Sequence, residues 1–174
     1  MGMSILEFAV RRNSEAGNYS SPAEDTHSGE KTMRFMMIVK ASKASEAGNM
    51  PSEELIATMG RYNEELTKAG ILLDAAGLQA TSKGMRVKFS ADGKKKLVDG
   101  PFTESKELIA GYWIIQVKSP EEAREWAKRA PSPHPGVECE IELRQFFEME
   151  DFPPSEGLNK QIELSKEMQK QKGK

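Results

Sequence analysis

The chain has 174 residues, 37% of them hydrophobic and 30% charged, a composition typical of one globular domain with polar ends. Its 25 basic side chains balance 27 acidic ones, so the net charge offers no attraction to a phosphate backbone, and we expect no nucleic-acid partner. The single cysteine, Cys139, excludes an intrachain disulfide and a thiolate metal cluster, and it favours a cytoplasmic location. No apolar run approaches the roughly 20 residues that span a bilayer, so we expect no membrane partner.

Composition divides the chain into three segments. Residues 1–32 are rich in Ser, Gly, Asn and Glu and lack apolar periodicity, which predicts a disordered N-terminal extension. Residues 33–152 contain the patterned segments and form the expected domain. Pro153 and Pro154 end this pattern, and residues 153–174 are expected to be a flexible or marginally helical tail.

The first half of the domain predicts a strand, a helix and a second strand. Residues 34–41 are apolar at both alternating sets of positions, which indicates a strand buried on both faces. Ser52 is a helix cap before two glutamates, and apolar residues then recur at helical spacing until Gly70 ends the helix. Residues 71–79 predict the second strand, with Gly77 expected to be a bulge.

The second half of the domain begins with a hairpin. Residues 85–89 and 95–98 alternate around Asp92-Gly93, a strong hairpin-turn signal. Residues 108–117 are apolar on both faces and predict the most buried strand. A capping box beginning at Ser119 opens a second helix, and residues 139–149 predict the last strand.

The element order is therefore β-α-β, an inserted hairpin, and β-α-β, which is an α+β fold of the ferredoxin-like βαββαβ type. Both helices of such a unit cover one face of the sheet, yet two strands are apolar on both faces. A bare second face would be a large exposed apolar patch. We therefore expect a homodimer in which two sheets pack face to face as a dimeric α/β barrel.

The stretch Asp-Gly-Pro-Phe-Thr-Glu-Ser-Lys-Glu at residues 99–107, followed by Gly-Tyr-Trp at 111–113, resembles the signature of the YCII-related, or DGPF-domain, family. The opening strand, the stop at Gly70 and Ala-Gly-Leu-Gln at 76–79 fall in the order typical of that family, so the resemblance covers the domain and neither end. It implies a ferredoxin-like fold, commonly dimeric, with a small cleft beside the sheet. Most members are uncharacterised, and a few of the wider group are small-molecule lyases or dehydrochlorinases.

The chain departs from the family at one point. The resemblance implies that the enzymes of the family use a histidine on the first helix together with an aspartate. That histidine would fall near Met59 or Gly60, and neither position is histidine. The two histidines of the chain are His27, in the N-terminal extension, and His134, in a loop. The His–Asp mechanism is therefore not transferred to this chain.

Asp99 is the candidate catalytic residue, since a carboxylate at a strand end facing a cleft can serve as a general base. The alternative is turn chemistry, in which Asp99 bonds a nearby amide, Gly100 supplies an unusual backbone angle and Pro101 fixes the next residue. The expected ligand-binding residues lie on the turn, the loop after it, a strand and the first helix: Asp99, Phe102, Glu104, Lys106, Glu107, Tyr112 and Tyr62. For the loop the alternative is a solvated surface, and for Tyr112 it is a core tyrosine with one hydrogen bond.

Three functions are compatible with these residues. The first is a ligand-binding or regulatory module that accepts a small organic molecule between the first helix, the strand with Tyr112 and the turn at Asp99. The second is a lyase or isomerase in which Asp99 moves a proton and Lys106 or Tyr112 stabilises negative charge. The third is a purely structural dimer. None of them requires a metal or a cofactor, and we expect neither.

Overall fold

The computed structural model describes residues 31–103 and 107–172. Four strands form an antiparallel sheet in the order β2-β5-β1-β6, and two more strands, β3 and β4, form a separate hairpin. The four-stranded order is that of a ferredoxin-like βαββαβ unit, with the hairpin inserted between β2 and β5. The α+β fold expected from the sequence is confirmed, including its inserted hairpin.

The two central strands are β1 (Met33–Lys40) and β5 (Ile109–Val117), paired antiparallel from Met33 opposite Val117 onward. Their side chains alternate between two faces of the sheet. One set is buried in the core: Phe35, Met37, Val39, Trp113, Ile115 and Val117. The other set, which includes Met36, Ile38, Tyr112 and Ile114, is half-buried on what we call the outer face. The prediction of apolar residues on both faces of these strands is therefore confirmed.

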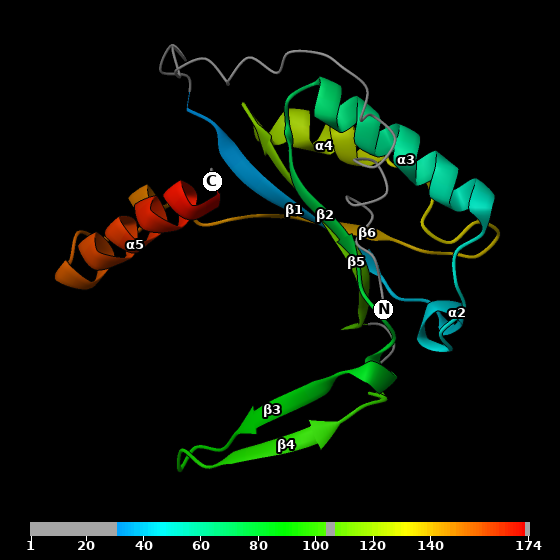
Figure 1. The fold of residues 1–174 in the computed structure, drawn as a ribbon, viewed down its shortest axis with the longest axis horizontal. Helices are drawn as coiled ribbons and strands as arrows, with labels where there is room; N and C mark the ends of the chain where they lie inside the picture. The colour runs from blue at the N-terminus through cyan, green and yellow to red at the C-terminus, as the bar shows by residue number, and fades with distance from the viewer. Residues whose placement is uncertain (1–30, 104–106, 173–174) are drawn as a thin grey trace.

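Helices α3 (Glu53–Lys68) and α4 (Pro120–Arg129) lie together over the core face of the sheet (Figure 1). The side chain of Ser52 caps α3 by accepting from the amide of Leu55, and Ser119 caps α4 through the amide of Glu122. Gly70 follows α3 with a φ of 72°, a conformation that favours glycine, as expected for the helix stop. The predicted capping box of α4 is half right, because Glu122 accepts from the amide of Lys118 rather than from that of Ser119.

The edge strands are β2 (Leu72–Gly77) and β6 (Ile141–Gln145), which pair with β5 and β1 respectively. The register of β2 shifts between Leu72 and Asp74, so the irregularity lies at Leu73, and the prediction of a bulge at Gly77 is wrong. Gly77 lies opposite Gly111, where the two strands approach closely. A Cβ atom on Gly111 would lie 2.8 Å from the carbonyl oxygen of Ala76, so glycine is needed there for space. The last strand also ends at Gln145, earlier than expected, and a 3-10 turn, η3 (Met149–Asp151), follows it.

The remaining elements lie outside the sheet. Helix α2 (Lys43–Glu46) and the 3-10 turn η1 (Thr81–Lys83) flank its lower end, next to the hairpin of β3 (Met85–Phe89) and β4 (Lys95–Asp99). Helix α5 (Glu156–Lys172) stands beside the upper end of the sheet, on the side opposite α3 and α4 (Figure 1). The hairpin and α5 thus extend from opposite ends of the strands, with the outer face between them.

Candidate functional site

The turn that begins with Asp99 packs against η1. The amide of Gly100 donates to the carbonyl oxygen of Gly84 at 3.0 Å, which places the two backbones in contact. A Cβ atom on Gly100 would lie only 1.8 Å from the carbonyl oxygen of Thr81, so no larger residue fits. The glycine of this motif is therefore required for space, and the expected unusual backbone angle at Gly100 is not among the positive φ values of the described residues.

A chain of hydrogen bonds fixes the same corner from three segments. The hydroxyl of Thr81 accepts from the amide of Phe102 at 3.1 Å and donates to a carboxylate oxygen of Glu46 at 2.5 Å. The amide of Thr81 donates to that same oxygen at 3.2 Å. Thr81 therefore ties the Asp-Gly-Pro-Phe turn to α2. No sequence signal pointed to Glu46 or Thr81, since each is ordinary by itself and they are 35 positions apart.

Beside this corner is a hollow of about 420 Å³, which we call the corner hollow. Its lining comes from the end of β2, η1, β3, the turn and the start of β5: Leu78, Gln79, Ala80, Thr81, Lys83, Gly84, Arg86, Phe102, Glu107, Leu108 and Ile109. The guanidinium of Arg86 lies over the ring of Phe102, 4.1 Å from its centroid. The lining thus combines aliphatic surface, a flat cation–aromatic pair and polar side chains, which suits a small organic molecule.

The structure brings two of the predicted ligand residues, Phe102 and Glu107, together at the corner hollow. Asp99 lies at the end of β4 opposite Met85, with its side chain exposed, and it does not contribute to the lining of this hollow. Its catalytic role stays a prediction. Glu104 and Lys106 lie outside the described residues.

The two predicted tyrosines lie on opposite faces of the sheet, so they cannot line one pocket. Tyr62 is buried in the core, where its hydroxyl donates to the carbonyl oxygen of Trp126 at 2.7 Å and its ring meets that of Trp113 edge to face. Burial raises the pKa of Tyr62 to about 12. Tyr62 therefore has the role of a core tyrosine, which the sequence analysis considered for Tyr112 and not for Tyr62.

Tyr112 points from β5 to the outer face, where its hydroxyl donates to a carboxylate oxygen of Asp74 at 2.9 Å. That hydrogen bond to a carboxylate raises the pKa of Tyr112, because the neutral phenol is the form that can donate. Asp74 also accepts from the amide of Ala75, so the pair is held on β2. The tyrosine and the carboxylate form a polar pair within a largely apolar face.

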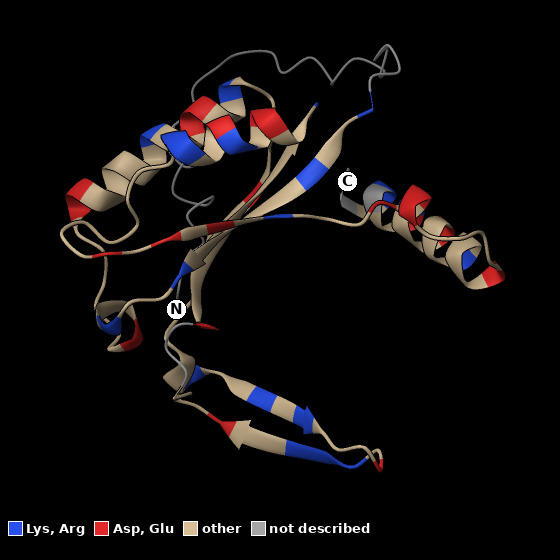
Figure 2. Ribbon diagram, turned by 180° about the vertical axis from the view of Figure 1, so that it is seen from behind, with Lys and Arg blue, Asp and Glu red and all other residues tan. Residues whose placement is uncertain are grey.

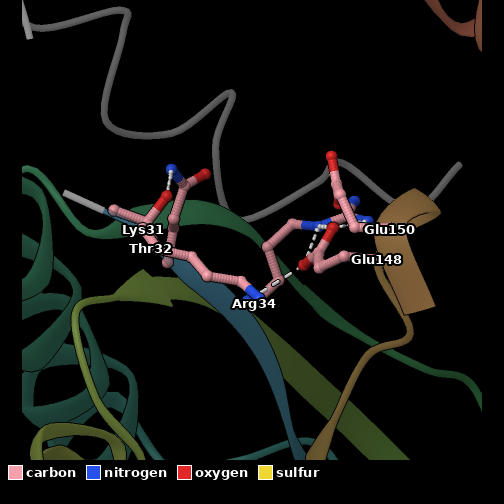
Figure 3. A pocket seen from close by; sticks show the side chains of 6 residues that line it. Lys31, Thr32, Arg34, Glu148 and Glu150 are labelled. Atoms are coloured by element: carbon pink, nitrogen blue, oxygen red, sulfur yellow. Dashed lines mark hydrogen bonds and ion pairs between the residues drawn. The ribbon is translucent and has the colours of Figure 1, made fainter. Parts of the chain in front are cut away.

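A second hollow, of about 480 Å³, lies at the other end of the sheet; we call it the end hollow (Figure 3). It is lined by Lys31, Thr32, Arg34, Gln116, Glu148 and Glu150. Arg34 of β1 holds Glu148 through its backbone amide and its guanidinium, with the closest side-chain contact at 2.9 Å. This ion pair raises the pKa of Arg34, chiefly through the hydrogen bond to Glu148. Of the two basic side chains that line the end hollow, Arg34 is therefore already paired with a neighbouring carboxylate.

Within the part of the chain that the structure describes, no group of three or more His, Cys, Asp or Glu side chains is arranged to hold a metal ion. His134 makes a hydrogen bond between its Nε2 atom and the carbonyl oxygen of Lys40 at 2.9 Å, which holds its loop against β1. Over the same described residues, none of the helices has the length and apolar character needed to cross a membrane.

Comparison with known proteins gives two findings. Residues 33–147 match the YCII-related domain family. The chain is also 29% identical over 85 residues to the uncharacterized protein R00369 of Rhizobium meliloti (strain 1021), a match that covers 49% of this chain and 68% of that protein. The family match spans well over half of the chain and coincides with the four-stranded sheet, its helices and the hairpin. The chain therefore belongs to the YCII-related domain family.

Proposed function

We propose that this protein is a homodimeric module that binds a small organic anion in the corner hollow. The observation that carries the proposal is the lining of that hollow, in which Arg86 stacks on Phe102 beside aliphatic side chains. Its volume of about 420 Å³ falls in the range of small-molecule sites. The Thr81 hydrogen bonds to Glu46 and Phe102 hold one wall in place before a ligand arrives.

The charges of the lining favour an anion over a cation. Two basic side chains, Lys83 and Arg86, line the hollow together with one acidic side chain, Glu107. A carboxylate can bind Lys83 while a flat apolar portion lies against Phe102 and Ile109. Small aromatic carboxylic acids combine both features.

The outer face supports the homodimer. Met36, Ile38 and Ile114 are adjacent there, because Met36 is opposite Ile114 and Ile38 is opposite Tyr112 in the register of β1 and β5. In the described residues, α3 and α4 cover only the other face (Figure 1). Two such sheets packed face to face would remove these side chains from water at about 25 cal/mol per Å² of apolar surface.

The test is a binding measurement on the full chain with a panel of aromatic and aliphatic carboxylic acids. A bound acid at 100 times its Kd stabilises the folded state by about 2.7 kcal/mol, which a thermal-shift screen detects, and calorimetry then gives Kd. The variant Lys83→Glu reverses a charge in the lining and is expected to raise Kd about tenfold. Lys43→Glu, on α2 and outside the lining, is the matched control and is expected to leave Kd unchanged.

Two results would contradict the proposal. A folded protein that binds no acid of the panel would contradict ligand binding in the corner hollow. Binding whose Kd is unchanged by Lys83→Glu would contradict it too. A monomer at micromolar concentration in light scattering would contradict the homodimer.

A further inference from the structure

The β3–β4 hairpin carries an apolar face that no described element covers. Met85, Val87 and Phe89 alternate along β3 to one side, and Leu97 lies opposite Val87 on the same side. Their exposed fractions include 61% for Met85, 69% for Phe89 and 63% for Leu97. A two-stranded hairpin is marginally stable alone in water, so an exposed apolar face of this kind requires a covering surface.

The hairpin is also strongly basic. Between residues 85 and 99 there are five basic side chains and two acidic ones, and basic residues lie on both strands (Figure 2). Lys88 and Lys96 lie directly opposite each other, a like-charge pair that destabilises an isolated hairpin. Arg86 lies over Phe102 and Lys94 pairs with Asp92, while Lys88, Lys95 and Lys96 are exposed.

A segment with the complementary character follows β6. We call residues 146–156 the crossing segment, because it leads from β6 to α5. It contains four acidic residues and no basic one. The rings of Phe147 and Phe152 contact each other at a tilt of 50°, and both remain exposed, Phe147 at 75%. Glu150, Asp151 and Glu156 are exposed, and Glu150 lines the end hollow.

The hairpin and the crossing segment lie beyond opposite ends of the strands. The hairpin joins the end of β2 to the start of β5, near the pair Gly77 and Gly111, whereas the crossing segment begins after Gln145, opposite Phe35 at the start of β1. They are therefore separated within one copy (Figure 1). A second copy that faces the first with its strands reversed brings each hairpin to the crossing segment of the other copy.

We propose that the hairpin is a dimerisation arm, whose apolar face and lysines dock on the crossing segment of a second copy of this chain. This inference rests on the homodimer of the proposed function and names the contact that fixes its orientation. Val87, Phe89 and Leu97 cover Phe147 and Phe152, and lysines at the hairpin tip approach Glu150 and Asp151. The two-fold axis makes this contact twice in each dimer.

The first test is a disulfide between copies in a chain whose single cysteine is removed by Cys139→Ser. One chain carries Leu97→Cys and a second, of different mass, carries Phe147→Cys; mixing them excludes a bond within one copy. Mild oxidation is expected to give mainly the mixed dimer of the two chains. Met50→Cys replaces Leu97→Cys as the control, because Met50 is 85% exposed and lies between α2 and α3, outside the hairpin and the crossing segment.

The second test is charge reversal with rescue. Lys95→Glu, opposite Phe89 on the apolar side of the hairpin, is expected to raise the dimer dissociation constant by about tenfold, because it places an acidic side chain against Glu150 and Asp151. Adding Glu150→Lys and Asp151→Lys to the same chain makes the charges of the hairpin and the crossing segment opposite again and is expected to recover the dimer. A general loss of folding would not be rescued in this way.

The outcomes separate this inference from the proposed function. A dimer that forms no mixed disulfide above the Met50→Cys control, or whose reversed charges are not rescued, overturns the arm and leaves the homodimer standing. A monomeric wild-type chain overturns both. Ligand binding in the corner hollow is measured separately and does not depend on either result.

Discussion

Gly100 shows how one missing side chain permits a contact between distant segments. The carbonyl oxygen of Thr81 occupies the space that a Cβ atom would need. We expect Gly100→Ala to lower the free energy of unfolding by about 3 kcal/mol, at the upper end of the cost of overpacking, because backbone must move. Urea denaturation measures this change in the free energy of unfolding. Gly60→Ala, on α3 with open space around its Cα, is the control and is expected to be neutral or stabilising, by up to about 1 kcal/mol.

The ionisation of Tyr62 makes the free energy of unfolding depend on pH. Burial raises its pKa from 10.0 in the unfolded chain to about 12 in the folded one, so the folded state favours the protonated phenol. This contribution is complete below pH 10 and is lost as the pH rises from 10 to about 12. We expect the urea midpoint of the wild type to fall more steeply over that interval than the midpoint of Tyr62→Phe. Parallel curves for the two proteins would contradict the assignment.

The same substitution has an effect at neutral pH. Tyr62→Phe removes the hydrogen bond to the carbonyl oxygen of Trp126 and is expected to cost about 1 kcal/mol at pH 7. The wild type should therefore be the more stable protein at neutral pH, and its advantage should shrink above pH 10 and reverse toward pH 12, because the variant has no phenol to titrate.

Helix α4 begins at a serine cap whose contribution can be isolated. Ser119 accepts from the amide of Glu122 at 3.1 Å, and its loss leaves that amide without its capping acceptor. We expect Ser119→Ala to lower the free energy of unfolding by about 1 kcal/mol. Ser119→Asp retains an acceptor beside the positive end of the helix dipole and is expected to stay near the wild-type value. Equal denaturation midpoints for the Ala and Asp variants would show that the cap contributes nothing.

Signals that act over a few residues made the elements predictable. The caps at Ser52 and Ser119, the stop at Gly70 and the turn at Asp92-Gly93 each depend on neighbours in sequence, and each stands where it was expected. The bulge was misplaced because glycine is the residue that sequence patterns associate with bulges, whereas the register shifts at Leu73. Its cause lies in the pairing of β2 with β5, which no local pattern reports.

The candidate site was less predictable than the fold, because it depends on contacts between distant segments. Phe102 and Glu107 could be selected from the Asp-Gly-Pro-Phe motif, and both line the corner hollow. Glu46 and Thr81 could not, since their pairing follows only from how α2 and η1 meet at the end of the sheet. Tyr62 and Tyr112 were grouped by residue type, and only the direction of each side chain separates them.

At the scale of the whole molecule, the outer face gives a direct test of dimerisation. Ile114 is half-buried at the centre of that face, between Met36 of β1 and Asp74 of β2. We expect Ile114→Asp to convert the dimer into a folded monomer, because a carboxylate cannot be buried between two sheets without a charge partner. Ile56→Asp, on the exposed side of α3, is the control and is expected to stay dimeric. Light scattering and circular dichroism check both variants, and a folded dimer of Ile114→Asp would contradict the packing.

The ion pair of Arg34 with Glu148 marks the point at which the chain leaves the domain toward its C-terminal helix. The backbone amide and guanidinium of Arg34 both hold that carboxylate, and the carbonyl oxygen of Arg34 accepts from the amide of Phe146. The chain is thus fastened to the first strand at the last point before it departs toward α5. A fluorescent label attached beyond this point is therefore a label on α5 and not on the sheet.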